Sequence, residues 1–229
     1  MISTIIRKFK TLLKLSYVDK TTKKYLNLNK SIFNPNLKSS SQNTGVILID
    51  LFDWNPFVFF WSIFSNFLKK KEYLDIKFFY FPLYNRYTEK YFFFKRKLIK
   101  IYESFGCSLG ITSLNKNPSH DQKKKYFSLF NNIKSKSDLV NYEYNSILIG
   151  DLIYDTILRK YRIPTFDLND KRFKKTFFEA HLIFDLILDY FDKNNVKYIL
   201  ISDVVYNSFG IITRIASQRN IKVFRLSEH

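Results

Sequence analysis

Polar side chains follow three of the predicted strands, at the point where each strand ends. They form three clusters: Asp50, Asp53 and Asn55; Ser202, Asp203, Tyr206 and Asn207; and Ser227, Glu228 and His229. In open α/β sheets, ligands bind beyond the carboxyl ends of the strands, so these clusters mark where chemistry is expected. Carboxylates and hydroxyls at such positions can hydrogen-bond the hydroxyl groups of a sugar, and a carboxylate or a histidine can accept a proton from one of them.

Asp53 and Asp203 are the candidate catalytic bases, and each has a structural alternative. Asp53 either contacts substrate or caps the helix predicted to begin at Pro56, and Asp203 either contacts substrate or helps turn its strand into the next helix. His229 is the last residue, and because chain termini are often mobile we expect no role for it. The remaining polar residues of the first two clusters are candidate substrate ligands.

A second group of polar residues lies on a helix predicted to begin at Gly150, and includes Tyr154. Asp151 and Asp155 are four residues apart and therefore share a helix face, which Arg159 extends. The segment either binds substrate or carries an exposed ion pair between Asp155 and Arg159. Such a pair contributes roughly a few tenths of a kcal/mol, and the spacing alone favours it.

Other kinds of site have little support in the sequence. No glycine-rich phosphate loop, dinucleotide-binding fingerprint or nucleophile elbow is present, so we expect no bound cofactor. The three histidines lack the spacing of a zinc site, and we expect no metal. The single cysteine, Cys107, rules out a disulfide within the chain and favours a reducing compartment.

The elements that would position these residues are those of an α/β protein. Strands are predicted at 45–51, 75–81, 196–201 and 221–226, with helices at 56–70, 88–105, 119–135, 150–161, 171–193 and 207–219. The strand at 45–51 is continuously apolar, which is typical of a parallel strand covered on both faces. The strand–helix–strand order predicts a Rossmann-like parallel sheet flanked by helices.

The N-terminal part is predicted to lie outside this fold. Residues 1–18 place apolar side chains at helical spacing between lysines and arginines, which predicts a basic amphipathic helix. That helix either packs on its own domain or lies on a membrane surface. Residues 19–44 are polar and predict a linker. We therefore expect a helix and linker over 1–43 and one Rossmann-like domain over 44–229.

The formal net charge of +18 has two explanations. It could mark a surface that binds a membrane or another polyanion. The chain is also rich in Phe, Tyr, Ile, Asn and Lys, which have A/T-rich codons. A mutational bias of the genome towards such codons would raise the lysine content without selection for an anionic partner. The basic residues are scattered along the chain, which favours solvated faces. No nucleic-acid motif is present, and we expect no nucleic-acid partner.

No membrane-spanning segment or secretory signal is predicted. The longest apolar run, 56–68, is shorter than the about 20 residues that a span requires. Lysines and arginines interrupt the apolar residues of the N-terminus, unlike a signal peptide. We expect a cytoplasmic protein that could lie peripherally at the inner face of the membrane.

The C-terminal part of the chain resembles a known family. The runs GDLIYDTILR, PTFDLND and ISDVVYNSFGIITRIASQRNIKVF, within 146–226, resemble the N-terminal region of bacterial capsule and surface-polysaccharide biosynthesis proteins with a GT-B-like glycosyltransferase fold. The positions that match the family pattern are Gly150, Asp151, Tyr154, Asp155, Arg159, Tyr206, Gly210 and Arg214. The strand and helix at 45–70 fit its first strand–helix–strand unit loosely.

The resemblance implies the acceptor-side half of a glycosyltransferase-like protein. It would bind a sugar or lipid-linked saccharide acceptor, and a second domain would supply the nucleotide-sugar donor. Two departures matter: the family pattern has a histidine where this chain has Asp203, and the sequence ends at His229 without a second Rossmann-like domain. We therefore expect a chain that is incomplete as an enzyme by itself. The alternative is a non-catalytic basic module that binds an anionic membrane surface or another polyanion.

Overall fold

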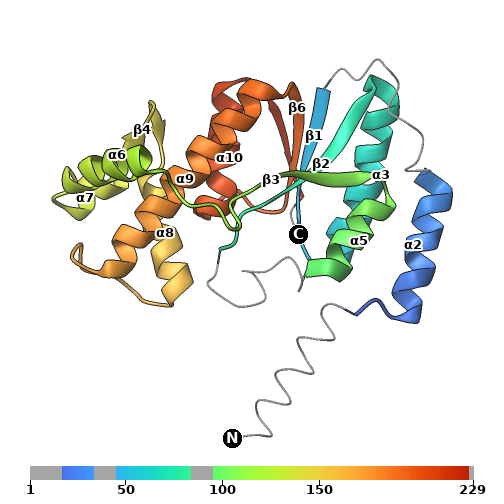
Figure 1. Cartoon of the computed structure of the whole chain (residues 1–229), viewed down its shortest axis with the longest axis horizontal. Helices are drawn as coiled ribbons and strands as arrows, with labels where there is room; N and C mark the ends of the chain where they lie inside the picture. Colours follow the sequence, from blue (N-terminus) through green and yellow to red (C-terminus); the bar gives the residue numbers. More distant parts are fainter. Residues whose placement is uncertain (1–16, 34–44, 84–94, 227–229) are drawn as a thin grey trace, which may run out of the picture. The chain divides into compact units, whose positions relative to one another are not determined.

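The computed structural model of the chain describes residues 17–33, 45–83 and 95–226. Five strands form a parallel sheet of order β3-β2-β1-β6-β7 flanked by helices, and β4 and β5 form a separate pair (Figure 1). The predicted α/β, Rossmann-like fold is confirmed. Most of the predicted N-terminal amphipathic helix and the polar cluster at 227–229 lie outside the described residues.

By its internal contacts the chain divides into two compact units. Unit 1 comprises Met1–Phe79 and Asn85–Gly110, and unit 2 comprises Tyr80–Tyr84 and Ile111–His229. The sequence predicted one domain over 44–229. The division falls inside that range, and the predicted domain bounds stay a prediction.

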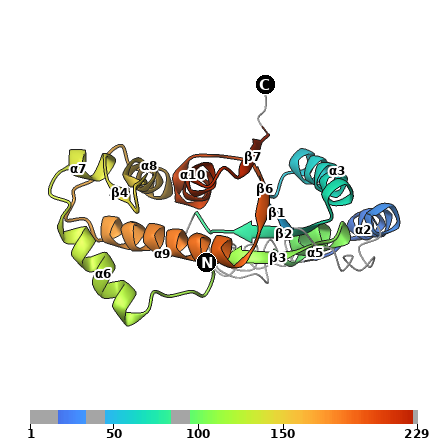
Figure 2. The ribbon, with the colours of Figure 1, turned by 90° about the horizontal axis from the view of Figure 1, so that it is seen from above.

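Unit 1 is built on the predicted strand–helix–strand unit. Strand β1 (Gly45–Asp50) is followed by α3 (Asn55–Glu72) and β2 (Leu74–Tyr80), and β1 pairs in parallel with β2, with Gly45 opposite Leu74. Every residue of β1 is buried, which explains its uninterrupted apolar sequence. Strand β3 (Cys107–Thr112) follows α5 (Arg96–Ser104). Both α3 and α5 lie on one face of these strands (Figure 2).

The expected linker at 19–44 contains a helix. Helix α2 (Lys20–Phe33) lies on the outer side of α5 in Figures 1 and 2. Its inward face is partly polar: the Asn29 amide donates to the Ser104 hydroxyl at 2.9 Å, and both residues are buried. The prediction of a linker missed this helix because two of its buried residues are polar, so its apolar periodicity is weak.

Helix α3 buries one face, and its other face is exposed and apolar. Phe57, Trp61 and Leu68 are buried, whereas Phe59 and Phe67 are each 59% exposed. None of the helices within the described ranges is long and apolar enough to cross a bilayer.

Unit 2 surrounds a long helix with shorter elements. Its elements are α6 (His120–Asn131), α7 (Lys136–Val140), β4 (Glu143–Tyr144), β5 (Ile147–Leu148), α8 (Gly150–Tyr161), α9 (Lys171–Lys193), β6 (Val196–Ile201), the π-helix η2 (Tyr206–Gly210), α10 (Ile211–Gln218) and β7 (Lys222–Arg225). Strands β6 and β7 pair in parallel, which confirms the predicted C-terminal strand–helix–strand unit. The N-terminal part of its helix is a π-helix rather than an α-helix.

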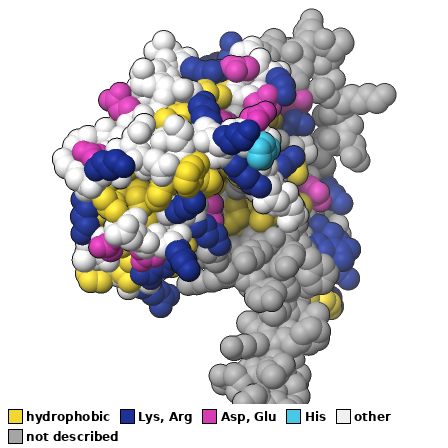
Figure 3. Space-filling model, turned by 60° about the vertical axis from the view of Figure 1, so that its left-hand side comes forward, with side chains coloured by type: hydrophobic (Ala, Val, Ile, Leu, Met, Phe, Trp, Pro, Cys, Tyr) yellow, Lys and Arg dark blue, Asp and Glu magenta, His cyan; other side chains and the backbone are white. Residues whose placement is uncertain are grey.

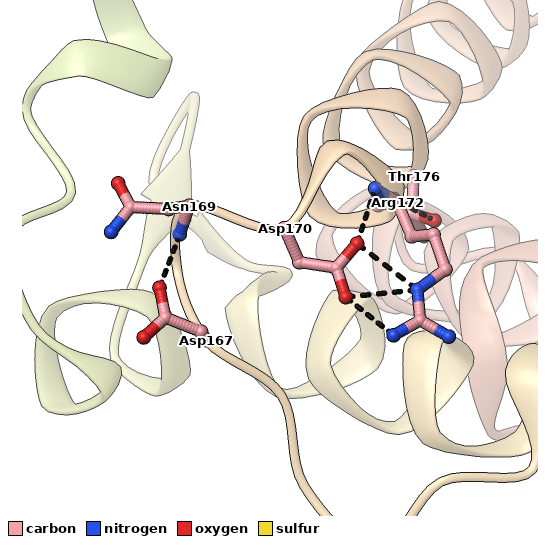
Figure 4. A network of polar contacts seen from close by, with 5 residues as sticks. All are labelled: Asp167, Asn169, Asp170, Arg172 and Thr176. Carbon is pink, nitrogen blue, oxygen red and sulfur yellow. Dashed lines mark hydrogen bonds and ion pairs between the residues drawn. The ribbon is translucent and has the colours of Figure 1, made fainter.

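The start of α9 shows why that helix begins where the sequence predicted. The Asp170 carboxylate accepts a hydrogen bond from the Arg172 amide at 2.8 Å, so Asp170 is the N-cap (Figure 4). The Arg172 guanidinium also reaches both carboxylate oxygens. Hydrogen bonds from this side chain and from the Arg172 amide hold the pKa of Asp170 below its usual range. Upstream, the Asp167 carboxylate accepts from the Asn169 amide at 2.7 Å and closes the turn.

A hydrogen-bonded cluster on α9 anchors α6 and the β4–β5 pair. The Asp185 carboxylate accepts from the Tyr126 hydroxyl at 2.6 Å and from the Tyr144 hydroxyl at 3.0 Å. One turn earlier, fully buried His181 contacts the Phe177 carbonyl oxygen through Nδ1 at 2.7 Å and the Tyr142 hydroxyl through Nε2 at 2.9 Å. A carbonyl can only accept, so Nδ1 carries the proton and neutral His181 accepts at Nε2.

Burial lowers the pKa of His181 to about 4 from an ordinary value of 6.5. Between these values the unfolded chain binds more protons than the folded one, so we predict that stability falls as the pH falls. Lowering the pH from 7 to 5 should remove about 2 kcal/mol from the free energy of unfolding through this residue. Urea denaturation at the two pH values measures the effect.

The matched variants are His181→Gln, which cannot titrate, and His120→Gln, at the exposed start of α6. The first should lose this part of the pH dependence even if it is less stable at pH 7, and the second should keep it. Equal pH dependence in wild type and His181→Gln would refute the assignment.

Candidate functional site

The polar face predicted on α8 is present, and it packs against the segment that follows β6. Asp151, Asp155 and Arg159 lie at four-residue spacing along α8, so they share one face of that helix. Asp151 is bound by Arg214, which comes from α10. The Asp155–Arg159 pair stays a prediction.

Arg214 clamps the start of α8. Its Nη1 and Nη2 atoms donate to the two Asp151 carboxylate oxygens, both at 2.6 Å, and Nη1 also donates to the Leu148 carbonyl oxygen at 2.6 Å. A two-point arginine–carboxylate contact fixes orientation as well as distance. This pair therefore sets the position of α8 relative to α10.

Asp155 lies one turn beyond this clamp and has a perturbed carboxyl group. Its partial burial, and next the charge of Asp151, raise the pKa of Asp155, while the Arg214 charge opposes the shift. A carboxyl group with a raised pKa holds a proton at higher pH than an ordinary aspartate, which suits a group that exchanges protons with a ligand.

The chain leaves β6 through a strained turn that Asp203 holds. The Asp203 carboxylate accepts from the Val204 amide at 2.7 Å and from the Val205 amide at 3.3 Å. Asp203 therefore has the structural role that the sequence left as an alternative, and Ser202, just before it, is half-buried. Tyr206 then adopts a left-handed backbone with a φ of 61° at the start of the π-helix η2. Strained residues and π-helical turns are frequent at functional sites.

Asn207 is the most unusual residue of this segment. Its backbone amide donates to the Thr156 hydroxyl of α8 at 2.8 Å, and the residue is 3% exposed. Within the described part of the chain, neither the nitrogen nor the oxygen of its side-chain amide has a hydrogen-bond partner. Leaving a buried polar group unpaired costs about 1–3 kcal/mol, so such a group calls for an explanation, such as a ligand or an ordered water.

A surface pocket of about 420 Å³ lies between α8 and this turn. It is lined by Asp155, Leu158, Arg159, Val205 and Tyr206. The pocket therefore joins two predicted sets of residues, the α8 face and the segment beyond the carboxyl end of β6. It offers a carboxylate, a guanidinium, a phenol ring and two apolar side chains to one ligand.

Three residues that match the family pattern, Gly150, Gly210 and Tyr154, make packing contacts. A Cβ atom on Gly150 would lie 1.6 Å from the Leu139 carbonyl oxygen, and one on Gly210 would lie 2.5 Å from a Leu152 methyl carbon. Both glycines therefore permit close packing of α8, against the end of α7 and against η2 respectively. Tyr154 packs its ring against Phe166, with 5.3 Å between ring centroids, and does not line the pocket.

The third set of predicted residues, at the end of β1, belongs to unit 1. Asp50 is 2% exposed, and the Tyr102 hydroxyl donates to its carbonyl oxygen at 3.0 Å. Burial first, and then the Asp50 charge, raise the pKa of the Tyr102 hydroxyl well above its usual range. A carboxylate so buried is not open to substrate.

The other two members of this set lie at the start of α3 and just before it. The N-cap of α3 is Trp54, without a side-chain hydrogen bond, so the alternative role of Asp53 as the cap is not observed. Asn55 lines a mainly apolar pocket of about 780 Å³ formed by α2, α3 and α5. A Lys97–Asp19 ion pair at 2.9 Å borders that pocket.

The basic charge does not gather into one patch on the face that Figure 3 shows. Lysines and arginines are spread there among acidic, uncharged and apolar side chains. That distribution fits solvated faces better than a nucleic-acid or polyanion groove on this face. Within the described residues no group of three or more histidine, cysteine, aspartate or glutamate side chains is placed to hold a metal ion.

The sequence did not reveal the contacts that two residues of the site make. Thr156 was not singled out, and Arg214 was marked only by the family resemblance. No local spacing links either to its partner, since Arg214 and Asp151 are 63 residues apart in the chain. Comparison of the chain with protein-family models, with curated proteins and with solved structures finds no match.

We predict that the Asp151–Arg214 pair is energetically coupled. In a double-mutant cycle with Asp151→Asn and Arg214→Gln, the coupling free energy should be about 1 kcal/mol. The contact is bidentate, but both side chains are about one-third exposed. The control cycle uses the more exposed Asp189–Lys193 pair of α9, which should give less than about 0.5 kcal/mol. Equal coupling in the two cycles would show that the clamp is only a surface contact.

Proposed function

We propose that this chain is the acceptor-side domain of a glycosyltransferase-like protein in bacterial surface polysaccharide biosynthesis, and that it binds its saccharide between α8 and η2. The observation that carries the proposal is the pocket lined by Asp155, Arg159 and Tyr206, which brings the polar face of α8 together with the turn after β6. The resemblance of 146–226 to such proteins supports the class of ligand.

The chemistry of the pocket suits a sugar. A carboxylate accepts from sugar hydroxyls, a guanidinium donates to them, and an aromatic ring packs against the apolar face of a pyranose. Asp155 and Arg159 supply the first two groups, and Tyr206 supplies the ring.

Within this proposal, Asp155 is the candidate general base. The acceptor hydroxyl oxygen forms a bond to the anomeric carbon of a nucleotide sugar, and the bond from that carbon to the nucleotide phosphate breaks. The phosphate leaves with the bonding electron pair, and the hydroxyl proton passes to Asp155. The nucleotide sugar would be held by a second domain. Asp203 is a weaker candidate than the sequence suggested, because its Oδ1 atom already holds the turn.

The place of action forms part of the same proposal. A saccharide acceptor of this class is carried on a lipid, so the protein would work in the cytoplasm at the inner face of the membrane. An isolated basic module without a saccharide site is the competing function.

We predict that the pocket residues determine saccharide binding. Calorimetric titration of the full chain with a panel of mono- and disaccharides should find a ligand whose affinity falls at least about tenfold in Asp155→Asn and in Arg159→Gln, a loss of roughly 1.4 kcal/mol. The matched control is Asp189→Asn, an exposed α9 aspartate outside the pocket, which should bind like wild type.

Saccharide binding that Asp155→Asn and Arg159→Gln leave unchanged would place the ligand elsewhere. Absence of binding across the panel would favour the basic-module function.

A further inference from the structure

The exposed face of α3 forms a continuous apolar stripe. Phe59, Phe60, Ile63 and Phe67 are 59%, 42%, 49% and 59% exposed. At 100° per residue they fall within an arc of roughly 100°, and exposed Pro56 lies within the same arc. The stripe therefore runs along nearly the whole length of the helix.

Buried contacts on the opposite face of α3 fix the rotation of the helix and keep this stripe exposed. Phe57, Trp61 and Leu68 are buried, and the buried Asn66 amide donates to the Phe105 carbonyl oxygen at 3.0 Å. Because these contacts fix the rotation of the helix, the stripe cannot turn inward. A row of large exposed apolar side chains of this kind marks an interaction surface.

The charges around the stripe identify the kind of partner. Lys70 and Lys71 are exposed and continue the stripe at its C-terminal end. The only acidic residue of α3 is Glu72, its last residue. An apolar face rich in phenylalanine with lysines beside it is typical of helices that lie in the interface of an anionic bilayer.

The net charge argues against a second copy of the chain as the partner. Each copy carries +18, so two copies repel one another, whereas an anionic surface attracts each of them. The apolar surface also extends sideways from the stripe, because Phe59 lines the pocket between α2, α3 and α5 as well.

We propose that α3 docks the protein on anionic lipid bilayers, with Phe59, Ile63 and Phe67 inserted at the acyl boundary and Lys70 and Lys71 at the phosphate level. This surface lies in unit 1 and the proposed saccharide pocket in unit 2. The inference therefore stands whether or not that pocket binds a sugar.

Vesicle flotation of the full chain tests the proposal. Wild type should bind phosphatidylcholine vesicles that contain about one-third phosphatidylserine, bind pure phosphatidylcholine far less, and release as salt is raised. The triple variant Phe59→Ser, Ile63→Ser, Phe67→Ser should lower the partition coefficient at least about tenfold, because it removes the inserted side chains. Lys70→Glu with Lys71→Glu should also weaken binding.

The matched control is Phe127→Ser with Val140→Ser, which removes two exposed apolar side chains of unit 2 and should leave partitioning unchanged. Circular dichroism checks that the variants fold. Ile63→Trp gives a second readout, since its fluorescence should be quenched by brominated lipids.

Three results would overturn the proposal: a triple variant that partitions like wild type, no quenching of the new tryptophan, or a dimer in light scattering that the triple variant converts to a monomer. The last result would identify a second copy as the partner. Asp155→Asn should not change vesicle binding, so failure here and failure of the saccharide site remain distinguishable.

Discussion

The attachment of α8 to the segment after β6 is the contact on which the proposed site depends. It is made at three points: the Thr156 hydroxyl accepts from the Asn207 amide, Gly210 allows close approach to Leu152, and Arg214 binds Asp151. The pocket lies beside these contacts, with Asp155 and Arg159 on one wall and Tyr206 on the other. Without the attachment, the polar face of α8 would have no opposing wall.

Two polar side chains of unit 2 differ in how their hydrogen-bonding groups are satisfied. Asp185 receives hydrogen bonds from two tyrosine hydroxyls, as is usual for a polar group that helps hold a core together. The Asn207 side chain is more deeply buried, yet both of its polar atoms lack protein hydrogen-bond partners among the described residues. A buried amide without a hydrogen-bond partner calls for a bound ligand or an ordered water, and it directly follows Tyr206, whose backbone is left-handed.

Much of the fold was predictable because it is written in local patterns. Helix α9 has the predicted bounds, since an N-cap aspartate precedes a long amphipathic run, and β1 and β6 follow from short apolar runs. Helix α2 was missed because part of its buried face is polar. Helical spacing predicted that Asp155 and Arg159 share one face of α8. The position of Tyr206 opposite them and the contact of Arg214 with Asp151 depend on distant segments, which no local pattern encodes.

The buried Asn207 amide lacks a hydrogen-bond partner among the described residues, so we expect that its polar groups do not stabilise the fold. The most direct measurement is the free energy of unfolding of Asn207→Leu, which replaces the amide by an apolar group of similar size. We predict that the variant is more stable than wild type by about 1 kcal/mol, because an unpaired buried polar group is removed. A variant less stable than wild type would contradict this prediction, because the Asn207 amide would then stabilise the fold.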